Sequence, residues 1–127
     1  MPVIEIVTNV QIEDTKSLSV KASTLFTQLL SIPANFVLTF VNVNPSMTFG
    51  GTDEPTALIN ALYLRQTSCP ANSLVIEKLT GLVNTELGVD PKRVFVNLSF
   101  GNPMDFGWNG ELLALVTSRD AGIPFRR

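Results

Sequence analysis

The sequence contains no histidine and a single cysteine, Cys69, among its 127 residues. The absence of histidine excludes Ser-His and Cys-His nucleophile systems and removes the commonest protein ligand for zinc. One cysteine can form neither a disulfide within the chain nor a cysteine metal cluster. We therefore expect no metal and no other cofactor, and any catalysis must use a different kind of group.

The chain also has few charges. Charged residues make up 16 % of the sequence, hydrophobic residues make up 45 %, and the net charge is −2. The surface of a small soluble domain usually carries about 25–35 % charged residues, so the shortage indicates that part of the surface is covered by other subunits.

No Lys/Arg stripe is present, which argues against a nucleic-acid partner. No apolar run is long enough to span a bilayer, and the start lacks the features of a signal peptide. Membrane insertion is not expected.

The chain begins with a strong strand signal, from Pro2 to Thr8, in which Glu5 is the only charge. A proline can open a strand because the first position need not donate a hydrogen bond. If Met1 is removed, Pro2 becomes a free secondary amine at the end of a rigid element. It is then the only credible catalytic group in the sequence. If Met1 is retained, the Pro2 nitrogen is an amide and cannot act as a base.

The sequence then uses one pattern, strand–helix–strand, twice. The first copy predicts strand 2–8, helix 15–30 and strand 36–43, and the second predicts strand 57–64, helix 72–87 and strand 93–100. A shift that carries Pro33 onto Pro91 aligns the two copies. Such crossovers join parallel strands, so the pattern predicts an α+β fold with one four-stranded mixed sheet and both helices on one face. Strand 36–43 carries apolar residues on both sides, Phe36, Leu38 and Phe40 on one and Val37, Val41 and Val43 on the other. This is typical of a strand buried on both faces.

Several regions of the sequence lie outside this repeated pattern or are not explained by it. The face of the sheet without helices is apolar, and self-association is the simplest way to cover it. The connection 44–55 is either a surface loop or a segment that packs on a neighbour or lines a pocket. Residues 111–117 are interpreted as a short strand, and residues 118–127 as a mobile tail. We therefore expect one domain, residues 1–110, followed by an extension, residues 111–127.

Four segments together resemble the macrophage migration inhibitory factor family, whose members include D-dopachrome tautomerase: MPVIEIVTNV, PANFVLTFVNVNPSMTFGGTDEPTAL, GVDPKRVFVNLSF and FGWNG. Each segment alone is a weak signal, but the combination is specific and covers about residues 2–110. The resemblance implies the tautomerase-like fold of that family. It also implies a homotrimer in which three sheets form a barrel surrounded by helices, with a site at each subunit boundary.

The same resemblance implies a function. Family members catalyse keto–enol tautomerisation of phenylpyruvate, a small aromatic keto acid, or of D-dopachrome, with the N-terminal proline as base. An apolar pocket suits this role because it lowers the pKa of an amine toward ambient pH. The resemblance further implies a cytokine-like protein that is secreted without a signal peptide, is also cytoplasmic, and binds a cell-surface receptor protein on immune cells.

Six further positions of the family pocket correspond to Ile32, Leu64, Phe95, Asn97, Phe106 and Trp108. Ile32 replaces a lysine that holds the substrate carboxylate, and Phe95 replaces a tyrosine. Asn97 matches an asparagine that reaches the pocket of the neighbouring subunit. Leu64 matches a position whose backbone N–H faces the substrate. Phe106 and Trp108 match residues that form the pocket walls. Packing in the core or in an interface is the alternative role for these residues.

The loss of the lysine removes a charge-assisted hydrogen bond worth roughly 1.5–3 kcal/mol. We therefore expect weak or absent activity on α-keto acids, in a protein that acts through its trimeric surface, and we expect Ile32→Lys to raise that activity. One alternative is an active phenylpyruvate/dopachrome tautomerase, or one that acts on a less anionic substrate. Another is a purely structural trimer.

Overall fold

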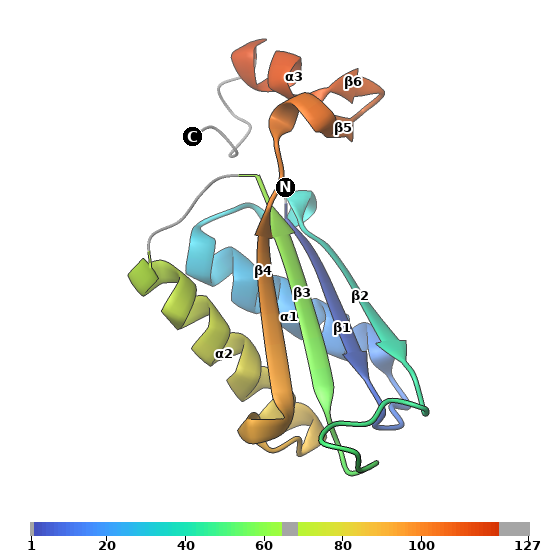
Figure 1. The fold of residues 1–127 in the computed structure, drawn as a ribbon. Coiled ribbons are helices and arrows are strands. Elements are labelled where there is room, and N and C mark those ends of the chain that lie inside the picture. The colour runs from blue at the N-terminus through green and yellow to red at the C-terminus, as the bar shows by residue number, and fades with distance from the viewer. Residues whose placement is uncertain (1, 65–68, 120–127) are drawn as a thin grey trace.

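A computed structural model of the chain describes residues 2–64 and 69–119. Its main sheet has four strands in the order β2-β1-β3-β4, and helices α1 and α2 pack on one face of it (Figure 1). The first unit is β1 (Val3–Thr8), α1 (Thr15–Leu30) and β2 (Leu38–Val43), and the second is β3 (Ala57–Tyr63), α2 (Cys69–Leu87) and β4 (Val94–Phe100). Each unit pairs its two strands in parallel, and β1 and β3 join the units in antiparallel fashion. The predicted α+β architecture is confirmed.

The core lies between the helices and the covered face of the sheet. Alternate residues of β1, namely Ile4 and Ile6, are almost fully buried, and so are Ile59 and Ala61 of β3. The helices contribute one stripe each, with buried residues at a spacing of about one helical turn: Leu18, Ala22 and Phe26 in α1 and Val75, Leu79 and Val83 in α2. Each large aliphatic or aromatic side chain buried in this way contributes about 1.5–3 kcal/mol of transfer free energy.

The buried helix residues and the turns of the two units align with a shift one residue shorter than the one from Pro33 to Pro91. Leu18 corresponds to Val75, and the short 3-10 turn η1 (Ala34–Phe36) corresponds to η2 (Pro91–Arg93). Pro33 precedes its turn, whereas Pro91 is the first residue of its turn. Both places tolerate proline because neither needs a backbone donor. The two prolines therefore occupy different positions of the same turn, and aligning them was wrong by one residue.

Strand β2 differs from its prediction. It lies at the edge of the sheet, and Leu38 and Phe40 are 60 % and 39 % exposed. The expectation of burial on both faces is wrong for the single chain because the helices cover only one face. Phe36 belongs to the turn η1 and precedes the strand. Helix α2 begins at Cys69, earlier than predicted.

The segment after β4 also differs. The turn η3 (Pro103–Asp105) leads into a hairpin of β5 (Gly107–Trp108) and β6 (Glu111–Leu112), and α3 (Leu113–Arg119) follows. The predicted strand over 111–117 is therefore wrong after Leu112. Leu113 and Val116 are both buried and are three residues apart, a spacing that places both on one face of a helix. Residues 120–127, which belong to the expected mobile tail, lie outside the described residues.

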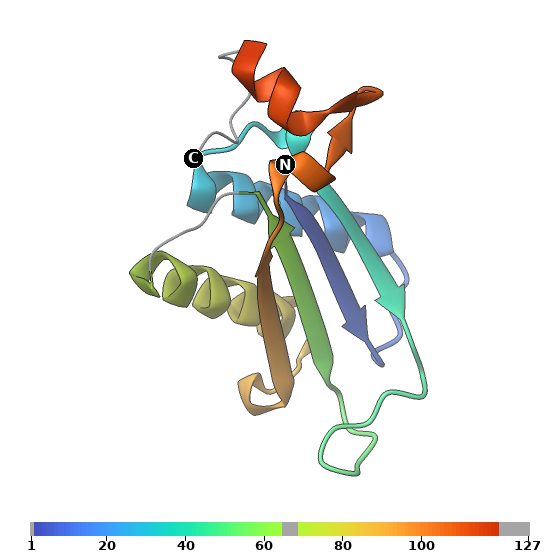
Figure 2. The same ribbon diagram turned by 45° about the horizontal axis from the view of Figure 1, so that its top comes forward.

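The connection between β2 and β3 is held against the chain's own sheet. The amide of Asn9 donates to the carbonyl oxygens of Met47, Asp53 and Glu54 at 3.0–3.2 Å. The ring of Phe49 packs edge-on against Phe95 of β4, with 5.1 Å between centroids. This connection lies at the end of the sheet opposite α3 (Figure 2). No helix in the described part of the chain is long and apolar enough to cross a membrane.

Candidate active site

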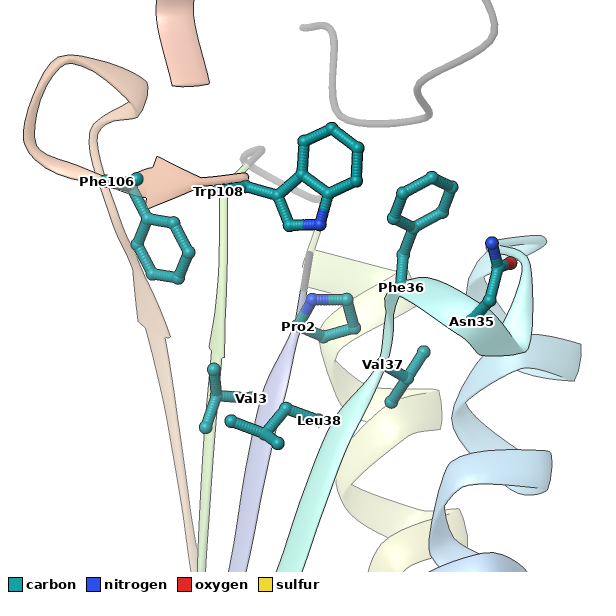
Figure 3. A pocket seen from close by; sticks show the side chains of 9 residues that line it. Pro2, Val3, Asn35, Phe36, Val37, Leu38, Phe106 and Trp108 are labelled. Carbon is teal, nitrogen blue, oxygen red and sulfur yellow. The ribbon is translucent and has the colours of Figure 1, made fainter. Parts of the chain in front are cut away.

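A pocket of about 380 Å³ lies where β1 begins, between the sheet and the C-terminal hairpin. One side is formed by Pro2 and Val3 with Val37 and Leu38, the second by Asn35 and Phe36 of η1, and the third by Phe106, Gly107 and Trp108 (Figure 3). These residues come from three distant parts of the sequence. The volume falls within the range of about 300–1,000 Å³ that is typical of small-molecule sites.

Pro2 is held at the end of the sheet. The backbone N–H of Leu38 donates to the carbonyl oxygen of Pro2 at 3.0 Å, which extends the parallel pairing of β1 and β2 by one step. Pro2 is buried in the described structure. Its ring therefore has a fixed place at the base of the pocket. The state of Met1, on which the chemistry of the Pro2 nitrogen depends, lies outside the described residues.

The aromatic walls are positioned by local turns. The ring of Phe36, at the end of η1, meets Trp108 edge-on at 5.8 Å between centroids. Trp108 is held in the β5–β6 hairpin, whose two central residues, Asn109 and Gly110, both have positive φ. An Asn-Gly pair with this geometry is the preferred two-residue hairpin turn. Phe106 is fixed by its carbonyl oxygen, which accepts from the N–H of Leu113 at 2.8 Å.

The pocket is almost free of polar side chains. Among the described lining residues, the only side-chain hydrogen-bonding groups are the amide of Asn35 and the indole N–H of Trp108, and none of these residues is charged. In Figure 3 the nitrogen-bearing edge of the Trp108 indole faces the Pro2 ring, and Asn35 stands at the outer side of Phe36. Within residues 2–64 and 69–119, no group of three or more potential metal-ligating side chains is present.

The structure brings three of the predicted site residues together, Pro2, Phe106 and Trp108. Leu64 is buried directly behind the pocket, where it packs with Leu113, Val116, Phe36 and Phe106. Ile32 is 5 % exposed and belongs to the core below the sheet, so its side chain is not part of the pocket wall. An uncharged residue at this place is compatible with the fold because its side chain packs among apolar neighbours.

Phe95 and Asn97 lie on β4, on the face of the sheet that no helix covers. Phe95 is 65 % exposed, and the Asn97 amide donates to Ser99 Oγ at 3.3 Å and to Asn60 Oδ1 at 3.5 Å. Neither residue lines the pocket of its own chain. Their contribution to the pocket of a neighbouring copy stays a prediction.

The sequence analysis missed Asn35, Phe36 and Leu38 as pocket residues. Phe36 and Leu38 were interpreted as parts of a strand buried on both faces. The proline-led turn PANF before the strand was the available signal for Phe36, and the Asn-Gly pair after Trp108 was the signal for the hairpin.

Two parallel strand–helix–strand units in one mixed sheet, with a proline directly before the first strand in a pocket at the end of the sheet, define an α+β protein of the tautomerase-like fold. The family model described as macrophage migration inhibitory factor (MIF) matches residues 1–114. The chain therefore belongs to the macrophage migration inhibitory factor family.

Individual relatives agree with this assignment. A macrophage migration inhibitory factor homologue of Trichinella spiralis is 28 % identical over 111 residues, which span 87 % of this chain and 97 % of that protein. The mouse macrophage migration inhibitory factor is 32 % identical over 82 residues, 65 % of this chain and 71 % of that protein. The solved structure of a homologue from Prochlorococcus marinus superposes with a TM-score of 0.82 at 26 % identity, covering 87 % of this chain and 98 % of that one.

Proposed function

We propose that this protein is a cytokine-like immune modulator, secreted without a signal peptide and also present in the cytoplasm, that binds a receptor protein on the surface of immune cells. Family membership supports this role. We propose further that it carries a Pro2-based tautomerase pocket that is weak toward α-keto acids. The observation that carries this second part is the pocket itself, in which Pro2 lies among mostly apolar residues and no described lining residue carries a charge.

We propose that three copies assemble through the open face of the sheet, which is the face that no helix covers. Leu38, Phe40 and Phe95 are exposed on that face, and Glu5 is the only charged residue in the four strands. An apolar surface of this kind is unfavourable in water, and association removes it. Val3 and Leu38 belong both to this face and to the pocket, so assembly would place each pocket beside a neighbouring copy.

In this proposal Pro2 acts after Met1 has been removed. Its secondary amine takes a proton from the carbon next to the substrate carbonyl and the proton is returned to the oxygen, or the reverse. Apolar surroundings favour the neutral amine, which is the form that can act as base. A keto acid must in addition bring its carboxylate into the pocket, and an ion without a partner is costly to remove from water.

The test is a steady-state assay of the protein without Met1 on phenylpyruvate. We expect kcat/KM to be about 10- to 150-fold below that of a family member with the lysine, the equivalent of one charge-assisted hydrogen bond. Pro2→Ala should abolish the remaining activity. Turnover equal to that of the lysine-bearing relative would contradict the proposal.

Two gain-of-function variants test whether the missing cation is the cause of weak activity. Ile32→Lys restores the residue type of the family, but the side chain starts from a buried place and has to reach out of the core. Asn35→Lys places the amine on a residue that already lines the pocket. We expect at least one of them to raise kcat/KM for phenylpyruvate by about tenfold. If both fold and neither raises it, the missing cation is not the cause of weak activity.

The second candidate function is an active phenylpyruvate/dopachrome tautomerase. The retained Pro2 and its aromatic walls favour it. Pro2→Ala separates the two functions in cells. Receptor binding and cytokine release that persist in Pro2→Ala support the cytokine-like role, whereas their loss together with turnover would make the enzyme activity primary.

A further inference from the structure

The described lining of the pocket consists almost entirely of aromatic and aliphatic groups. Phe36 and Phe106 stand on opposite sides of Pro2, with Trp108 above it in the view of Figure 3. Such walls are suited to a flat ring, since aromatic pairs are favourable in edge-on and offset arrangements.

A cationic side chain is missing from the described surroundings as well as from the described lining of the pocket. The lysines and the arginine whose side chains are described lie on α1, α2 and η2: Lys16, Lys21, Lys78, Lys92 and Arg93. The strands that form the open face carry one charged residue, Glu5, which is negative. If a neighbouring copy covers the pocket with this face, its strands supply no positive charge there. An anionic ligand would therefore lose its hydration without a partner.

The indole N–H of Trp108 is the polar group best placed to orient a ligand. It makes no hydrogen bond with any residue that the structure describes, and the side chain is 37 % exposed. Its nitrogen-bearing edge faces Pro2 (Figure 3). An indole N–H can only donate, so it selects ligands that present an acceptor such as a carbonyl oxygen.

We propose that this pocket binds neutral aromatic carbonyl compounds, with the Trp108 indole N–H donating to the carbonyl oxygen and the ring lying between Phe36 and Phe106 over Pro2. The inference deepens the proposed function because it concerns the same Pro2 pocket. It assigns the ligand class, which is neutral, and the residue that determines its orientation, which is Trp108.

The test measures binding without turnover. Trp108 is the only tryptophan in the chain, so ¹⁵N-labelled full-length protein without Met1 gives a single indole N–H signal in a proton–nitrogen spectrum. This protein is titrated with methyl benzoate, benzoate and ethylbenzene, which share a phenyl ring with one short substituent and differ in charge and in hydrogen-bond acceptor. We expect methyl benzoate to bind at least about tenfold more tightly than benzoate and to move the indole proton downfield. Ethylbenzene should bind without that downfield shift.

Two variants locate the hydrogen bond. Trp108→Phe keeps a ring and removes the donor, so the affinity for methyl benzoate should fall about fivefold, to that of ethylbenzene. Asn35→Ala removes the other polar side chain of the pocket and should leave the preference for the ester unchanged. If Trp108→Phe does not fold, the indole shift of the unmodified protein still decides between ester and hydrocarbon.

Three results would overturn the inference. Benzoate that binds as tightly as its ester would mean that a cation is present in the pocket, either the protonated amine of Pro2 or a side chain that the structure does not describe. An indole signal that does not move downfield with the ester, or ester binding that depends on Asn35 in place of Trp108, would remove Trp108 from its role. Methyl benzoate and benzoate have no enolisable carbon, so these outcomes are independent of whether the protein is a tautomerase.

Discussion

At the scale of single residues, Arg93 shows how one side chain organises a distant segment. Its guanidinium donates to the carbonyl oxygens of Phe49, Thr52, Glu54 and Pro55 at 2.9–3.3 Å. It also lies 5.3 Å from the centre of the Phe49 ring, which is within the range of a cation–π contact. Arg93 therefore fixes the connection between β2 and β3 together with Asn9, whose amide donates to three carbonyl oxygens of the same segment.

We predict that Arg93→Ala lowers the free energy of unfolding by about 2 kcal/mol, since several charge-assisted hydrogen bonds are lost at a partly exposed place. Arg93→Lys should recover less than half of this, because an ammonium cannot reproduce the forked geometry of a guanidinium. Urea unfolding measures both. Lys92→Ala is the matched control, and its effect should stay within about 0.5 kcal/mol. Equal stability of Arg93→Ala and Lys92→Ala would contradict this role of Arg93.

At the scale of secondary structure, the two long helices end differently. Ser31 closes α1 in the left-handed region, with φ 54° and ψ 42°, and its N–H donates to the carbonyl of Thr27. Gly88 follows α2 with φ +69°, and its N–H donates to the carbonyl of Asn84 at 3.0 Å. The left-handed conformation costs an L-residue roughly 1–2 kcal/mol, whereas glycine adopts it readily. The end of α1 is therefore the strained one.

We predict opposite effects at these two positions. Ser31→Gly should stabilise the protein by about 0.5–1 kcal/mol by relieving the backbone. Gly88→Ala should destabilise it by about 1 kcal/mol. A Cβ at Gly88 would meet no atom within 4 Å, so its cost is that of the backbone alone. Thermal unfolding followed by circular dichroism gives both changes, and shifts of the same sign would refute the explanation.

At the scale of the whole molecule, the open face of the sheet contains a polar row within an apolar surface. The carboxylate of Glu5 accepts from the amides of Asn42 at 3.0 Å and of Asn60 at 3.1 Å. The charge is therefore provided with donors from both neighbouring strands. Apolar residues border this row on both sides, with Val3 and Leu38 toward the pocket and Val7 and Leu58 toward the other end. Such a face can be covered by another subunit without leaving an unpaired carboxylate.

We predict that Phe95→Glu weakens self-association strongly, because a carboxylate placed in the covered face has no partner there. At micromolar concentration, sedimentation should show a shift from the trimer toward the single chain. Val20→Glu on α1 is the control, since Val20 is 64 % exposed and Phe95 is 65 % exposed. Val20 lies on a helix outside the proposed interface, so this variant should assemble normally. Dissociation by both variants, or by neither, would argue against assembly through the open face.

The sequence by itself determined the features of the fold that depend on local residue patterns. The periods of the apolar residues predicted both strand–helix–strand units. The position of Pro2 at the start of a strand was also readable. Even so, the alignment of Pro33 with Pro91 was wrong by one residue, because proline fits more than one position of a short turn.

The tertiary structure alone decided which residues meet. It buries Ile32 in the core and places Phe36 opposite Trp108. It also makes Leu113 the first residue of α3, where the side chain packs against Leu64. These outcomes depend on packing between segments far apart in the chain. A local apolar pattern shows that a residue will be buried, but it does not show against which neighbours. The walls of the pocket, the uncharged nature of its described lining residues and the position of its indole donor are consequences of that packing.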